Sequence, residues 1–182
     1  MGNAESLSYL YPELVLVFFA FLSLLGSVFS RKGAFPSGMV TFFGTAVSTL
    51  FLAQSFEAGP SLFFGLVVND AFSIFFRQLI LIITALTVLI SLGYRGIDKE
   101  DEGEYYFFLL TIAVSMMLAV SSNNLFMIYL TVESISIVSY IVVSYLRREI
   151  LSSEAGIKYF LFGALSTGVM LYGISLVYGL FG

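Results

Sequence analysis

One acidic residue inside a long apolar segment is the feature of this sequence most suited to chemistry. Glu133 lies eight residues into the apolar run 125–146 and more than ten residues before the basic pair that ends it. At about 1.5 Å per residue, a helix would carry this carboxyl group deep into the hydrocarbon layer of a membrane. Such a group stays protonated, pairs with a cation or lines a water-filled cavity, because a bare carboxylate in lipid is costly.

Three polar side chains share a helical face with this carboxyl group. Tyr129, Glu133, Ser136 and Tyr140 fall at i, i+4, i+7 and i+11. All four can hydrogen-bond, so together they could hold a chain of water molecules that carries protons. Two interpretations stay open. The favoured one is a proton relay, and the other is a protonated Glu133 that donates one hydrogen bond and stabilises helix packing.

Lys158 is a second candidate for an ion path. It lies at the start of the apolar run 157–181, where a long side chain can reach back to the membrane surface. The alternative is that it lines the cytoplasmic mouth of an ion path. Glu154 precedes it by four residues and could pair with it on one helix face. Similarly, the spacing of Asp70 and Arg77 suggests a pair at the outer interface.

The composition excludes most chemistry that the chain could perform alone. No Cys is present for a disulfide or a thiolate-held iron–sulfur cluster, and no His for haem or zinc. No glycine-rich nucleotide fingerprint and no basic stripe for nucleic acid is found. We therefore predict no catalytic residue, cofactor or metal on this chain.

Long apolar segments predict an all-α integral membrane bundle. Of 182 residues, 59% are hydrophobic and 11% charged, which leaves little polar surface to meet water. A helix needs about 20 apolar residues to span the hydrocarbon layer, and six segments approach that length. We expect one transmembrane domain over 1–182, surrounded by lipid, with helices at about 13–29, 37–56, 72–94, 105–121, 125–146 and 157–181.

The basic residues predict the orientation of this bundle. Six of the eight fall in the loops after the first, third and fifth segments, and cytoplasmic loops are the ones enriched in Lys and Arg. Both termini should therefore face away from the cytoplasm. Five of the twelve acidic residues fall within 98–104, which is expected to be a solvated loop. The six basic residues are Arg31, Lys32, Arg95, Lys99, Arg147 and Arg148.

The second half of the chain resembles a known family. Its most specific pieces are VESISIVSY (132–140), SSEAGIKYF (152–160) and GALSTGVMLYGISLVYG (163–179). In this order and spacing they are similar to the N subunit of NADH–quinone oxidoreductase, respiratory complex I. Earlier in the chain the resemblance consists of helix layout and the pattern VVNDAFSIFFRQL (67–79).

This resemblance implies a proton-translocating, antiporter-like membrane subunit without a redox cofactor of its own. The family's intramembrane glutamate falls on Glu133, and the lysine of its KYF motif falls on Lys158. NADH, quinone, FMN and iron–sulfur clusters would belong to partner subunits, and quinone reduction elsewhere would drive transfer. The partners would be other membrane-arm subunits, one of them touching the segment 57–70. The membrane would be a bacterial inner membrane or an energy-transducing organelle membrane.

The chain is much shorter than the family pattern. Members have about fourteen helices, built as two inverted five-helix units. The lysine that pairs with the family's glutamate lies on the helix after the sixth. The abrupt end at Gly182, with no polar tail, favours a fragment or a split subunit. Two other functions stay open: a subunit of a multisubunit cation/proton antiporter, and a non-transporting assembly scaffold.

Overall fold

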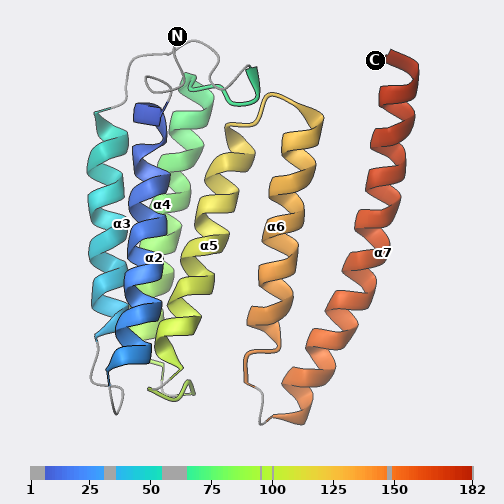
Figure 1. Ribbon diagram of the computed structural model, residues 1–182. Coiled ribbons are helices and arrows are strands. Elements are labelled where there is room, and N and C mark those ends of the chain that lie inside the picture. Colours follow the sequence, from blue (N-terminus) through green and yellow to red (C-terminus); the bar gives the residue numbers. More distant parts are fainter. Residues whose placement is uncertain are drawn as a thin grey trace.

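The computed structural model is a helical bundle (Figure 1). It describes residues 7–30, 36–54, 65–94, 96–99, 101–146 and 149–181. Within these ranges a short 3-10 helix precedes six α-helices, and the only β feature is one isolated bridge. The elements are η1 (Ser8–Leu10), α2 (Tyr11–Phe29), α3 (Ser37–Ala53), α4 (Ala71–Leu92), α5 (Glu102–Val120), α6 (Leu125–Val143) and α7 (Ile150–Phe181).

Local sequence signals explain where these helices begin. Pro12 lies in the first turn of α2, where its missing N–H costs nothing. Asp70 caps α4 through a reciprocal capping box with Ser73: the Ser73 N–H donates to Asp70 Oδ1 at 2.8 Å, and the Asp70 N–H donates to Ser73 Oγ at 3.0 Å. Asn124 caps α6 by accepting a bond from the Phe126 N–H at 2.8 Å.

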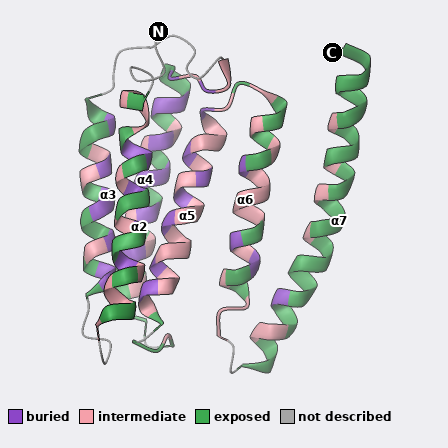
Figure 2. Cartoon of the chain, viewed as in Figure 1, coloured by how far each residue is buried: buried purple, intermediate pink, exposed green. Residues whose placement is uncertain are grey.

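Helices α2 to α5 form the tightly packed part of the bundle. α2 packs against α3 and α5, and α4 packs against the same two helices. Their inward faces meet in one apolar cluster, and Figure 2 shows that most buried positions lie on these four helices. The cluster consists of Leu16, Ala20, Leu52, Ile80, Leu81, Leu110, Ala113 and Met117.

The buried face of α3 is made of small and hydroxyl side chains. A Cβ at Gly44 would lie 2.6 Å from the ring of Phe19, so glycine is what lets α3 approach α2 this closely. Ser48 Oγ donates to the Pro12 carbonyl at 2.9 Å and ties α3 to the start of α2. Thr41 and Thr45 are also buried on this face.

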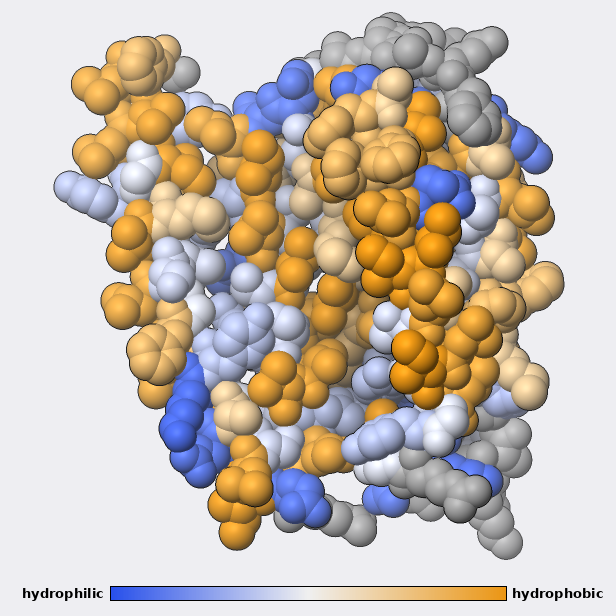
Figure 3. Space-filling view, turned by 180° about the vertical axis from the view of Figure 1, so that it is seen from behind, coloured by the Kyte–Doolittle hydropathy of each residue, from blue (hydrophilic) through white to orange (hydrophobic). Residues whose placement is uncertain are grey.

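Helix α7 stands apart from the compact part. It packs against α6, and Gly156 is the only buried residue among the 32 of this helix. Its apolar side chains are exposed along most of its length (Figure 2). From behind, the molecule presents mostly apolar side chains, and strongly hydrophilic colour gathers mainly toward its two ends (Figure 3). This is the surface expected of a protein that lipid surrounds.

The predicted membrane bundle is confirmed. Five of the helices are long and apolar enough to cross a membrane, and α3, with 17 residues, is shorter. The chain is a multi-pass membrane protein. Both described ends of the chain lie at the same end of the bundle (Figure 1). Which side of the membrane they face stays a prediction, and of the six basic loop residues only Lys99 lies within the described part.

Most predicted helix ends agree with the structure to within three residues, but two segments differ. The last helix begins at Ile150 rather than 157, so Glu154 and Lys158 lie inside it. The acidic stretch 98–104 is not wholly a loop, because Glu102 and Glu104 form the first turn of α5. Acidic side chains are stabilised at a helix N-terminus by the unpaired backbone N–H groups there.

Candidate functional site

The carboxyl group of Glu133 lies in the middle of α6 with one oxygen unused. Its Oε2 atom is buried and has no hydrogen-bond partner among the described residues. Beside it in sequence, the Ser134 hydroxyl lies 2.9 Å from the Ser115 hydroxyl and joins α6 to α5. Buried polar atoms in proteins nearly always have a partner, in the protein or in ordered water. The open oxygen is therefore suited to binding a water molecule or a proton.

The three polar residues predicted to share its face have different surroundings. Ser136 donates its hydroxyl to the Val132 carbonyl at 2.9 Å. Tyr140 is buried and meets the rings of Tyr159 and Phe160 edge-on, at centroid distances of 4.9 and 5.7 Å. Its ring thus packs α6 against α7. Tyr129 is half-buried. Among the described residues, none of these side chains hydrogen-bonds directly to Glu133.

Lys158 lies on an exposed face of α7. Its ammonium group forms an ion pair with Glu154, one turn earlier, which confirms the predicted pairing. The Lys158 side chain is 66% exposed, and the pair does not include Glu133. Within the described residues the structure therefore supplies no cation to the buried carboxyl group.

Sequence analysis missed a second charged centre. Arg77 Nη2 lies 2.7 Å from Glu13 Oε2, with both side chains almost fully buried. Nη1 donates to Asn69 Oδ1 at 2.9 Å, and Nη2 also donates to the Tyr9 carbonyl at 3.1 Å. The predicted pair of Asp70 with Arg77 is wrong, because Asp70 caps α4 instead. One signal in the sequence could have revealed this ion pair. Glu13 and Arg77 have opposite charges, and each lies near the N-terminal end of its own apolar helix.

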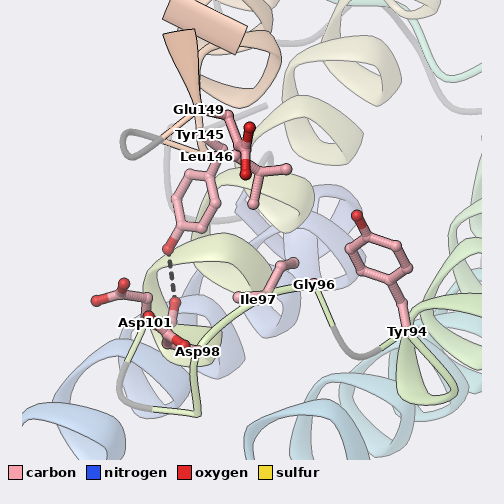
Figure 4. Close-up of a pocket in the computed structure, with 8 residues that line it drawn as sticks. All are labelled: Tyr94, Gly96, Ile97, Asp98, Asp101, Tyr145, Leu146 and Glu149. Carbon is pink, nitrogen blue, oxygen red and sulfur yellow. Dashed lines mark hydrogen bonds between the residues drawn. The ribbon is translucent and has the colours of Figure 1, made fainter. Parts of the chain in front are cut away.

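A cavity of about 560 Å³ opens at the opposite end of the bundle (Figure 4). Across it, the Tyr145 hydroxyl donates to the Asp101 carbonyl at 2.6 Å. Asp98, Asp101 and Glu149 give the cavity an acidic lining. No group of three or more carboxylates in the described part of the chain is placed to hold a metal ion. The cavity lies at the end predicted to face the cytoplasm.

Comparison with known proteins identifies the family. Residues 122–182 match the family model described as "NADH:quinone oxidoreductase/Mrp antiporter, TM". NADH-quinone oxidoreductase subunit N of Jannaschia sp. is 38% identical over 185 residues, covering 98% of this chain and 38% of the relative. Subunit N 2 of Chloroherpeton thalassium is 37% identical over 157 residues, covering 84% and 30%. The chain thus spans about a third of the length of these curated relatives.

Solved structures agree with this relationship. A chain of respiratory complex I from Thermus thermophilus superposes with a TM-score of 0.69 at 29% identity, over 92% of this chain and 36% of that one. A chain of the membrane-bound sulfane sulfur reductase, an archaeal respiratory membrane complex, superposes with a TM-score of 0.78. At 17% identity, over 96% of this chain and 37% of the other, that likeness shows the fold alone.

The sequence pieces that suggested the resemblance fall inside the region that the family model matches, and the fold agrees with that of a complex I membrane chain. The chain is therefore homologous, over most of its own length, to about a third of the antiporter-like membrane subunit N of NADH-quinone oxidoreductase.

Proposed function

We propose that this chain is part of a proton-translocating subunit of a complex I-type NADH–quinone oxidoreductase, with Glu133 as its proton relay. The observation that carries the proposal is the unpartnered, buried Oε2 of Glu133 in a membrane-spanning helix of an antiporter-like chain. The subunit works with other membrane-arm subunits. NADH, FMN, iron–sulfur clusters and quinone belong to partner subunits, and this chain has no Cys to hold an iron–sulfur cluster.

The chemistry of the relay follows from the surroundings of the carboxyl group. A carboxyl group can pass a proton on through hydrogen-bonded water, and the unpartnered Oε2 atom leaves Glu133 a position for such a water molecule. A chain of water molecules that starts at Oε2 would link it to the hydroxyl groups of Tyr129, Ser136 and Tyr140 on the same face. Lys158, paired with Glu154 on α7, would mark the mouth of the path.

The test is proton transfer in vesicles of native membranes that contain the whole complex. With NADH as electron donor and a pH-sensitive dye as reporter, Glu133→Ala should lower proton transfer at least about tenfold, as loss of a proton-transferring group does. Assembly, checked on a native gel, should be unchanged. Glu102→Gln, in the first turn of α5, is the matched control and should transfer protons normally. Undiminished transfer by the Glu133 variant would refute the proposal.

A second function is favoured by one observation. The matching family model also covers Mrp antiporters, so the chain could serve a cation/proton antiporter that has no redox partner. The same vesicles separate the two functions. Sodium-dependent proton flux without any electron donor would indicate the antiporter. If Glu133→Gln instead left transfer normal but weakened assembly, the chain would be a scaffold.

A further inference from the structure

The buried charged centre belongs to a longer series of contacts at one end of the bundle. Arg77 of α4 bonds to Glu13 of α2 at 2.7 Å and to Asn69, just before α4, at 2.9 Å. Arg77 is 1% exposed and also bonds to the Tyr9 carbonyl, so three partners from two segments of the chain fix its position. A planar guanidinium with two engaged arms holds its partners at set angles, unlike a flexible ammonium.

The residues next to Asn69 form the only β-bridge in the described part of the chain. The Val68 N–H donates to the Ser121 carbonyl at 2.8 Å, and the Asn123 N–H donates to the Leu66 carbonyl at 2.9 Å. Val67 and Ser122 stand opposite each other in this antiparallel bridge. The segment before α4 is thereby fastened to the turn between α5 and α6.

This turn sets the start of α6. Asn124 follows it directly and caps α6, and its Oδ1 also accepts the Tyr178 hydroxyl of α7 at 3.0 Å. Glu133 lies nine residues farther along, about 13 Å below the cap at 1.5 Å per residue. A rigid helix transmits any axial shift of its first turn to that carboxyl group.

We propose that Arg77 is a positioning residue for Glu133, acting through Asn69 and the Val67–Ser122 bridge. The inference rests on the proposed function of Glu133. The ion pair with Glu13 holds Arg77 in the packed α2–α5 part of the bundle. The hydrogen bond between Arg77 and Asn69 restrains the neighbouring bridge residues. The bridge in turn sets the axial position of α6 in the membrane. Proton transfer falls steeply when reacting groups move apart, so the axial position of α6 controls the rate of proton transfer through Glu133.

The experiment uses a reversible cross-link. The chain has no Cys, so the double variant Val67→Cys with Ser122→Cys creates the only thiol pair on it. Opposite residues in such a non-hydrogen-bonded pair have Cα atoms about 4.5 Å apart. A disulfide accepts Cα separations of about 4.4–6.8 Å. In the native complex the cysteine pair should oxidise readily, which the mobility of this chain on a gel measures. Proton transfer, measured by the dye assay, should be unchanged.

Two uncoupling variants test the link to Arg77. Asn69→Ala removes the hydrogen bond between Arg77 and Asn69 but keeps the Glu13–Arg77 ion pair. The double variant Glu13→Leu with Arg77→Met removes both charges, so that neither is left buried without its partner. Each should slow oxidation of the cysteine pair severalfold and lower proton transfer about tenfold in the reduced state. Oxidation should restore transfer, and reduction with dithiothreitol should abolish it again. A merely structural defect would not be repaired by one bond at the bridge.

The outcomes separate this inference from the function on which it rests. Normal proton transfer in both uncoupling variants, or no recovery on cross-linking, would overturn the positioning role while leaving Glu133 as the relay. Unchanged oxidation rates would overturn the link between Arg77 and the bridge, whatever the chain transports. Suppose that Glu133→Ala transferred protons normally while the two uncoupling variants still slowed oxidation of the cysteine pair. The proposed function would then be wrong, and the link between Arg77 and the bridge would stand.

Discussion

Two acidic residues of this chain have opposite surroundings. Glu13 has a guanidinium partner at 2.7 Å, whereas Glu133 has an oxygen without any partner among the described residues. At the scale of single residues, this contrast gives Glu13 a structural role in the packed part of the bundle, and it supports the proposal that Glu133 exchanges protons.

The Glu13–Arg77 pair gives the first prediction, which concerns stability. Glu13→Ala leaves a buried cation without its partner and should destabilise the protein by about 3–5 kcal/mol. Glu13→Leu with Arg77→Met should cost far less, because no charge is left uncompensated. Thermal unfolding in mild detergent measures both variants. Equal losses would mean that packing, rather than charge, decides the stability of this region.

At the scale of elements, the start of α4 gives a second prediction. Asp70→Ala removes the side-chain half of the capping box and should cost about 1 kcal/mol of stability. Hydrogen exchange at the amide of Ser73 should speed up accordingly. Asp101 precedes α5 without a side-chain cap bond and is the matched control. A comparable loss in Asp101→Ala would show that the negative charge, not the cap, is what matters.

The contact of α2 with α5 gives a third prediction. A Cβ at Gly103 would lie 2.7 Å from the Ser23 carbonyl oxygen, an atom of the backbone that cannot turn away. Gly103→Ala should therefore destabilise the protein by about 1–3 kcal/mol through overpacking. Gly168→Ala, where α7 has open space, should instead stabilise by about 0.5–1 kcal/mol through helix propensity. Detergent unfolding of the two variants should give opposite signs.

At the scale of the whole molecule, orientation gives the fourth prediction. Asn123 and Lys99 are exposed at opposite ends of the bundle, and the absence of Cys makes single-cysteine labelling clean. A membrane-impermeant maleimide should label Asn123→Cys in intact cells and Lys99→Cys only after permeabilisation. The reason is the excess of basic residues on the Lys99 side. The reverse pattern would place both termini in the cytoplasm.

The whole molecule is also unevenly packed. Helices α2 to α5 bury a common core, whereas α7 exposes apolar side chains on nearly every face. In water such a helix would aggregate, but in lipid it needs only internal backbone hydrogen bonds. The exposed length of α7 therefore agrees with a membrane location.

The motifs within 132–179 indicated the family. The sequence by itself also determined the helical class, the approximate helix ends and the position of Glu133 within its helix. These depend on local quantities: apolar length, capping residues and the high cost of a charge in lipid. It also predicted the Lys158–Glu154 pair, because residues four apart on a helix are neighbours.

Only the tertiary structure decided which distant groups meet. Glu13 and Arg77 are 64 residues apart, and no periodicity links them until α2 and α4 stand in one bundle. The Val67–Ser122 bridge and the open oxygen of Glu133 are likewise products of packing between segments. Sequence spacing alone predicted a pair between Arg77 and the nearby Asp70. That prediction was wrong because Asp70 accepts a hydrogen bond from the backbone N–H of Ser73 at the start of α4.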